Sequence, residues 1–119
     1  MAADIKDYGV HAFGEEPPGL ELQHRAIGAA KGHPNYVEAA AYVYCQPSVF
    51  FLDLDEPKYS GLKKRLGEVA AGLRRIVVVS FWTSTRIPEP LAGAGKTFDF
   101  FIHPESMAIL YADTGSWKS

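Results

Sequence analysis

Cysteine is nearly absent from this chain of 119 residues, because Cys45 is the only one. A single cysteine cannot form an intrachain disulfide, and it argues against a zinc site built from thiolates. Histidine gives no alternative, since His11, His24, His33 and His103 lack the i, i+2 or i, i+4 spacing of paired metal ligands. We therefore expect neither a metal nor a cofactor.

An excess of charge of one sign is also missing. The chain has 12 basic and 14 acidic residues and a net charge of −2. Nucleic-acid-binding proteins usually carry a basic patch, because neutralising phosphates supplies most of their affinity. Basic residues gather only between positions 63 and 75, where we interpret them as the solvated face of a helix. Direct binding of nucleic acid is not expected.

Long apolar runs are lacking too. No stretch approaches the roughly 20 apolar residues that a membrane-spanning helix needs. The first residues, MAADIKDYG, do not have the basic segment and apolar run of a secretion signal. We therefore expect a cytoplasmic protein without a membrane association.

Apolar residues are nevertheless sufficient for a core, since hydrophobic residues make up 47% of the chain. The length predicts one domain over residues 1–119. Glycine and proline are dense in residues 1–19, which predicts a loop-rich N-terminal segment, and residues 86–96 contain two of each. We interpret 86–96 as a connecting loop.

Residues 48–85 give the clearest structural signal. The order predicts a strand over 48–54, a helix over about 57–75 and a second strand over 76–83. Apolar residues in the helix recur at spacings of 4, 3, 4 and 3, which predicts one continuous buried stripe. This stripe consists of Leu62, Leu66, Val69, Leu73 and Ile76.

The flanking segments complete the predicted fold. Helical spacing favours a helix over 20–31, and residues 35–46 favour a short helix followed by a strand from about Ala41. Residues 97–103 and 107–113 predict a hairpin around Pro104. The expected fold is α+β, with a curved, largely antiparallel sheet packed on one long helix (57–75) and one or two N-terminal helices. The alternative is an α/β sandwich with a right-handed parallel strand–helix–strand unit at 48–85.

Two carboxylates follow the strand of residues 48–54. The segment VFFLDLDEP resembles the first motif of the haloacid-dehalogenase-like phosphohydrolases, which implies a nucleophile at Asp53 and an acid/base at Asp55, with magnesium. The family's Gly-Thr pair is replaced by Glu56-Pro57, and no later strand ends in paired acidic residues. We therefore favour a role in capping the next helix, with Asp55 or Ser60 as the cap, or in contacting a partner.

A second group of polar residues lies on the last strands. Asp99 and His103 share one face of their strand, and Ser80 and Trp82 share one face of theirs. If the two faces adjoin, Asp99 and His103 could line a pocket in the concave sheet and act as an acid/base couple. The alternative is the ordinary alternation of a half-exposed antiparallel strand.

The order of the predicted elements resembles the nuclear-transport-factor-2-like fold. The segment TFDFFIHPESMAILYADTGSW is similar to the closing hairpin of small bacterial immunity proteins from polymorphic toxin and contact-dependent growth inhibition systems. This resemblance implies a non-catalytic protein that neutralises a cognate toxin by direct binding. We expect acidic residues to meet a basic, nucleic-acid-directed toxin, because complementary potentials orient association. The candidate partner-binding residues are Asp53, Asp55, Glu56, Trp82, Asp99 and His103.

Overall fold

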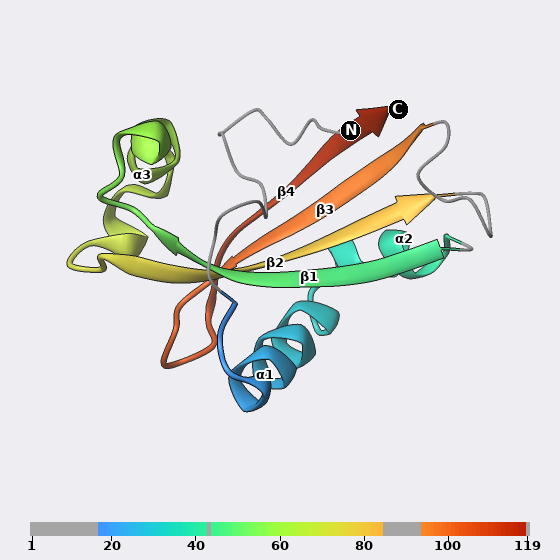
Figure 1. The fold of residues 1–119 in the computed structure, drawn as a ribbon, viewed down its shortest axis with the longest axis horizontal. Coiled ribbons are helices and arrows are strands. Elements are labelled where there is room, and N and C mark those ends of the chain that lie inside the picture. The colour runs from blue at the N-terminus through green and yellow to red at the C-terminus, as the bar shows by residue number, and fades with distance from the viewer. Residues whose placement is uncertain (1–16, 43, 85–93, 119) are drawn as a thin grey trace.

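The computed structural model describes residues 17–42, 44–84 and 94–118. They form an α+β fold around an antiparallel sheet of four strands, which follow one another across the sheet in chain order (Figure 1). The strands are β1 (Tyr44–Asp53), β2 (Arg75–Ser84), β3 (Ala94–Ile102) and β4 (Ile109–Lys118). The predicted α+β class and antiparallel sheet are confirmed.

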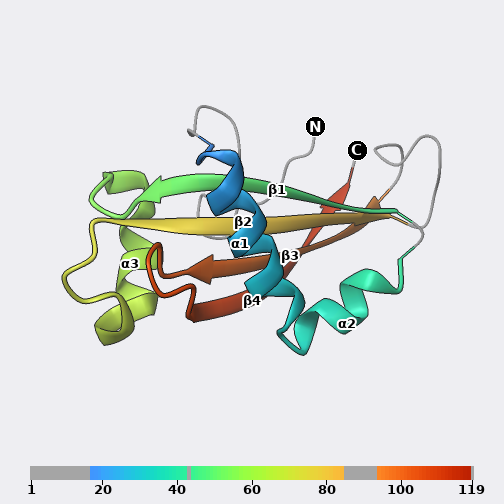
Figure 2. The same cartoon turned by 90° about the horizontal axis from the view of Figure 1, so that it is seen from below.

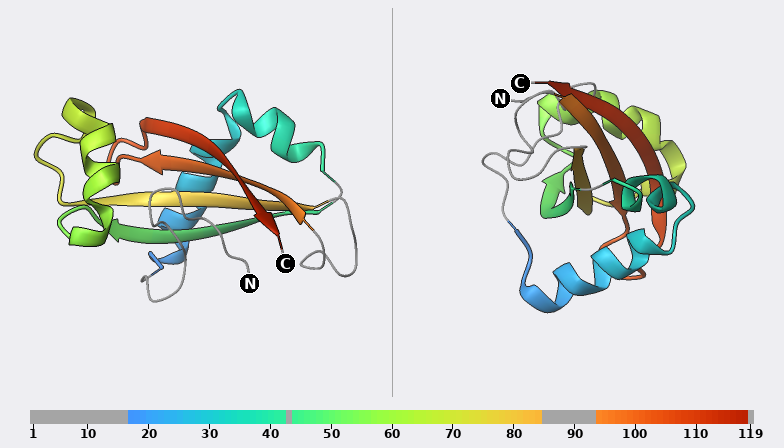
Figure 3. Two further views of the ribbon diagram at one scale, coloured as in Figure 1. Left: turned by 90° about the horizontal axis from the view of Figure 1, so that it is seen from above. Right: turned by 90° about the vertical axis from the view of Figure 1, so that its right-hand side faces the viewer.

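The helices lie on both faces of this sheet. Helix α1 (Leu20–Lys31) crosses one face and α2 (Asn35–Ala40) follows it on the same side, as Figure 2 shows. Helix α3 (Ser60–Leu66) lies at one end of the opposite face (Figure 3). Two short 3-10 turns flank it, η1 (Pro57–Tyr59) and η2 (Gly67–Ala70).

The alternative with a parallel strand–helix–strand unit at 48–85 is wrong. β1 pairs with β2 in antiparallel register, with Phe50 opposite Val78 and Asp53 opposite Arg75. The segment between the two strands stays at the end of the sheet where β1 finishes, so the chain re-enters the sheet beside its exit point (Figure 1). A parallel unit would need this segment to cross the length of the sheet.

The single long helix predicted over 57–75 is also wrong. Gly67 has φ +58° and ψ −130°, a backbone conformation open essentially only to glycine, and it ends α3. The chain then turns in a new direction, so that Ala70 is buried while Val69 is 55% exposed. Of the predicted stripe, Leu62, Leu66 and Ile76 are buried in one cluster and Leu73 packs against it, but Val69 is exposed and the stripe does not lie on one continuous helix.

The other element boundaries differ in smaller ways. The helix predicted over 20–31 matches α1, and the short helix after residue 35 matches α2. β1 runs through Pro47, which an edge strand tolerates because one side of its backbone has no ladder to complete. β3 already begins at Ala94, and β4 reaches Lys118 as an edge strand. The remainder of the predicted 86–96 loop and residues 1–16 lie outside the described residues.

Two buried clusters hold the helices on the sheet. On the α1 side the cluster contains Ala26, Ala30, Ala39, Val77, Val79, Phe81, Phe98, Phe100 and Ile102. On the α3 side it contains Phe50, Leu52, Leu54, Tyr59, Leu62, Leu66, Ala70, Ile76, Val78 and Phe101. β2 contributes to both, as its apolar residues on both faces predict for a central strand. Because α3 is short, it packs only against the end of the sheet where β1 finishes and β2 begins. Farther along the same sheet face, the side chains of the strands are mostly polar.

Candidate functional site

The first candidate group is formed by the carboxylates at the end of β1. Asp53 is the last residue of the strand, and its Oδ1 accepts a hydrogen bond of 2.9 Å from the backbone N–H of Asp55. This local bond turns the chain out of the sheet, as an aspartate side chain often does. Neither Asp55 nor Ser60 caps the following helix through its side chain, so that prediction is wrong.

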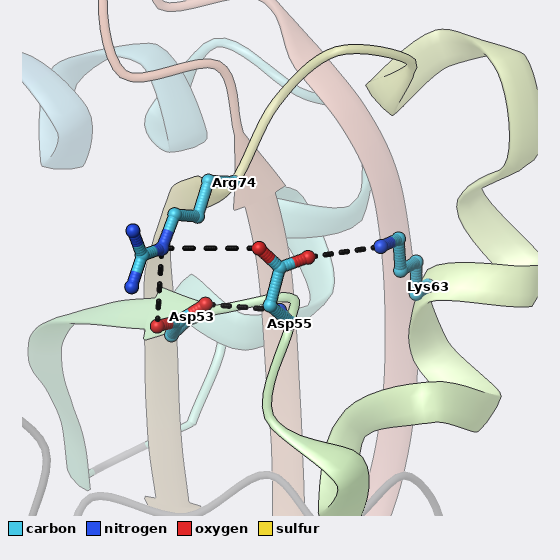
Figure 4. Close-up of polar contacts among 4 residues, drawn as sticks. All are labelled: Asp53, Asp55, Lys63 and Arg74. Carbon is cyan, nitrogen blue, oxygen red and sulfur yellow. Dashed lines mark hydrogen bonds and ion pairs between the residues drawn. The ribbon is translucent and has the colours of Figure 1, made fainter.

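Two cations meet these carboxylates, as Figure 4 shows. Lys63 Nζ lies 2.9 Å from Asp55 Oδ1, and Arg74 Nε lies 3.6 Å from Asp53 Oδ2 and 3.8 Å from Asp55 Oδ2. The hydrogen bond from Lys63, its charge and the charge of Arg74 lower the pKa of Asp55 despite some desolvation. The Asp55 and Lys63 side chains are each 53% exposed, so water and salt screen the pair.

This arrangement does not supply a phosphohydrolase centre. A magnesium ion would compete with Lys63 and Arg74 for the same carboxylate oxygens. The described residues contain no group of three His, Cys, Asp or Glu side chains placed to hold a metal ion. The structure brings Asp53, Asp55 and exposed Glu56 together as a charged surface rather than as a reaction centre.

The second candidate group lies on the sheet face against which α3 packs, in the half of that face that α3 does not cover. Register places Ser80 opposite Asp99 and Trp82 opposite Thr97. Ser80 Oγ donates a hydrogen bond of 2.6 Å to Asp99 Oδ1, and the Asp99 residue is only 6% exposed. The expectation that these two strand faces adjoin is therefore met.

His103 does not join this group. Its Nδ1 accepts backbone hydrogen bonds from Glu105 (3.1 Å) and Ser106 (3.3 Å), which makes it a turn residue of the β3–β4 hairpin. His103 lies four positions along the chain from Asp99, a distance of about 13 Å at the usual rise of a strand. Phe101 lies between them in the α3-side cluster. The structure does not bring Asp99 and His103 together as an acid/base couple.

The sequence reasoning missed two neighbours of this group on β4. Asp113 lies opposite Asp99, and Gly115 lies opposite Thr97. The alternation in FDF and ADT places polar residues on one face of each strand, but only the register shows which residues meet. We call the resulting set of residues the polar sheet half. It consists of Gln46, Ser48, Ser80, Trp82, Thr97, Asp99, Asp113 and Gly115.

Cys45 on β1 has no sign of a nucleophilic role. It is half-buried, and burial raises the pKa of its thiol more than the charge of Lys31 lowers it. Since the thiolate is the reactive form, this thiol is less reactive than a free one at neutral pH.

Comparison of the chain with known protein families, curated proteins and solved structures finds no match. No helix of the described residues is long and apolar enough to cross a membrane. Function must therefore be argued from the two groups of side chains themselves.

Proposed function

We propose that this chain is a non-catalytic binding protein, an immunity protein that acts in the bacterial cytoplasm and neutralises a cognate toxin by direct contact. The observation that supports this proposal is the exposed charged surface at the end of β1, where Asp53, Asp55 and Glu56 project beside Lys63 and Arg74. The partner in this proposal is a basic, nucleic-acid-directed toxin. A contact-dependent growth inhibition system is the setting in which such a pair is produced.

The ion pairs at this surface are compatible with partner binding. Exposed pairs contribute little to stability, so a partner's Lys or Arg can replace Lys63 or Arg74 at low cost. Charges on a rim speed and orient encounter more than they add to final affinity. The strand end fixes the position of Asp53, and the Asp53–Asp55 hydrogen bond fixes the turn that follows.

The surroundings of the carboxylates carry charge of both signs. Residues 53–75 contain six basic and four acidic residues (6 − 4 = +2), whereas the whole chain has a net charge of −2. A partner must therefore place basic groups at the carboxylates and acidic or neutral groups beside α3. Such a two-signed pattern rejects proteins that are uniformly basic, because like charges would then meet.

A second candidate function is that of a small ligand-binding protein or enzyme that uses the polar sheet half. The buried Ser80–Asp99 hydrogen bond favours it. An acid/base mechanism with His103 is not available to it, because His103 is engaged in the hairpin turn.

The experiment that tests the immunity function is co-expression of the chain with the protein encoded directly upstream. We expect the two proteins to co-purify and the chain to restore growth of cells that express the upstream protein. The variant Asp55→Lys should reduce both effects, because a partner's basic groups would meet a like charge. The matched control is Glu105→Lys, a charge reversal in the β3–β4 turn, which contacts α1 on the other face. Absence of both complex and rescue, or equal effects of the two reversals, would contradict the proposal.

A further inference from the structure

The β3–β4 turn, residues 103–108, is held closed by one histidine. The ring nitrogen Nδ1 of His103 accepts backbone hydrogen bonds from Glu105 (3.1 Å) and Ser106 (3.3 Å). The backbone of His103 closes the rest of the turn, since its N–H donates to the carbonyl of Ala108 (2.9 Å) and its carbonyl accepts from the N–H of Met107 (3.1 Å). The ring therefore binds the middle of the turn, which the backbone of His103 does not reach.

Met107 shows that the closed turn is not a relaxed conformation. Its φ is +64°, in the left-handed region that is unfavourable for a residue with a side chain. Its side chain packs against the α1-side cluster, so the closed turn combines an apolar contact with a strained backbone. Loss of the hydrogen bonds to His103 Nδ1 would favour release of this strain.

The acceptor role of Nδ1 depends on the charge of the ring. A neutral imidazole has one acceptor nitrogen, whereas an imidazolium carries a proton on both nitrogens and accepts at neither. Histidine is the side chain whose charge ordinarily changes between about pH 5 and 8. A proton on Nδ1 of His103 would face the N–H groups of Glu105 and Ser106, so both hydrogen bonds would be lost. The closed turn uses the neutral ring, and its stability is therefore lost as the pH falls.

Three charged groups lie on the elements around this turn. From α1, Arg25 Nη2 donates to the carbonyl of Glu105 (3.4 Å), and Glu105 carries the opposite charge on the turn itself. From α3, Arg65 donates to the hydroxyl of Tyr111 on β4 (2.9 Å). All three charged side chains are exposed, so water and salt screen their influence on the His103 ring. His103 is itself partly exposed, and its ring can follow the pH of the solution.

We propose that the β3–β4 turn is a pH-sensitive switch, which protonation of His103 opens in mildly acidic solution. Opening separates Glu105 from Arg25 of α1 and frees Met107 from its strained conformation and from the α1-side cluster. The turn lies at the end of the sheet where β1 also finishes (Figure 1). The switch does not depend on whether the chain binds a toxin.

His33 provides a comparison within the chain, because it begins a second His-Pro sequence. Its Nδ1 accepts one backbone N–H, from Asn35 (3.1 Å). Backbone hydrogen bonds also cross this turn, from Tyr36 to the carbonyl of His33 (3.0 Å) and from Val37 to the carbonyl of Pro34 (3.1 Å). Pro34 has an ordinary helical conformation, and α2 continues from it. We therefore expect acid to leave the His33 turn closed.

The test is NMR of the ¹⁵N-labelled chain between about pH 8 and 5. At the upper end, imidazole ¹⁵N spectra should show His103 with its proton on Nε2, because Nδ1 accepts. As the pH falls, the protection of the Glu105 and Ser106 amides from hydrogen exchange, corrected for the intrinsic effect of pH, should drop about tenfold, which corresponds to about 1.4 kcal/mol. Protection of Asn35 should change less. A proton on Nδ1 of His103 at neutral pH, or protection that does not change with pH, would overturn the proposal.

The matched variant is His103→Asn. The Asn side-chain oxygen accepts backbone N–H groups two residues on and carries no titratable charge. This variant should keep the turn closed at neutral pH and abolish its response to acid. His24→Asn, at an exposed position of α1, should respond like the unmodified chain. An unchanged acid response in His103→Asn, or its loss in His24→Asn, would refute the switch.

Discussion

Two buried threonines on neighbouring strands differ in a way that shows where the chain is not optimised for stability. Thr83 Oγ1 donates to the carbonyl of Lys96 (2.9 Å) and accepts from its N–H (3.3 Å). Thr97 is buried to nearly the same extent, yet its Oγ1 has no partner. Proteins retain such unfavourable groups most often at functional sites.

Replacement of each threonine by valine should therefore have opposite effects. Thr97→Val exchanges an unsatisfied hydroxyl for a methyl group of similar size and should raise the free energy of unfolding by about 1 kcal/mol. Thr83→Val leaves the backbone groups of Lys96 without their side-chain partner and should lower it by about 1–3 kcal/mol. Urea titrations of both variants measure the difference. Destabilisation by Thr97→Val as large as that by Thr83→Val would mean that the Thr97 hydroxyl is satisfied.

Helix α3 is short because of a single backbone conformation. Gly67 adopts φ +58°, which directs the chain into η2 and then, through Gly72 at φ +81°, back into β2. This keeps α3 and its basic residues at one end of the sheet and leaves the polar sheet half beyond its reach. The amphipathic pattern alone favours a continuous helix, because the spacing of apolar residues does not show that the backbone changes direction at Gly67.

A pair of glycine replacements tests whether the conformation of Gly67 limits the length of α3. Gly67→Ala should lower the free energy of unfolding by about 1–3 kcal/mol, because alanine is strained in that conformation. Gly61→Ala lies within α3, meets no atom within 4 Å and should raise it by about 0.5–1 kcal/mol through helix propensity. Thermal unfolding followed by circular dichroism compares them. Stabilisation by Gly67→Ala would show that the helix can continue through this residue.

The whole molecule is predicted to be one domain, and its two clusters give the means to test this. The clusters lie on opposite faces of the sheet, but both contain residues of β2 and β3. Unfolding of these strands would therefore disrupt both clusters. We therefore expect one cooperative unfolding transition.

Matched core replacements on the two faces measure this cooperativity. Ile76 belongs to the α3-side cluster and Ile102 to the α1-side cluster, and both are fully buried. Ile76→Val and Ile102→Val should each lower the free energy of unfolding by about 0.5–1.5 kcal/mol and shift the same transition. Val37→Ala, at a residue that is 73% exposed, should change it by less than about 0.5 kcal/mol. Tryptophan fluorescence and far-UV circular dichroism that give separate midpoints would contradict a single domain.

The sequence by itself determined the local elements and their apolar faces. The strands around Phe50, Val78 and Phe101 and the helix over 20–31 follow from periodicity, which depends only on neighbouring residues. The position of Asp53 at a strand end and the hairpin around Pro104 followed from the same local signals.

Only the tertiary structure decided which residues meet. Three features depend on contacts between distant positions. They are the antiparallel pairing of β1 with β2, the ion pairs of Lys63 and Arg74 with the strand-end carboxylates, and the register that places Asp99 opposite Asp113. A shift of one residue in register would move each side chain to the other face of the sheet, and periodicity does not specify that register between strands. For this reason the sequence paired Asp99 with His103 on its own strand, whereas the fold places Asp99 between Ser80 of β2 and Asp113 of β4.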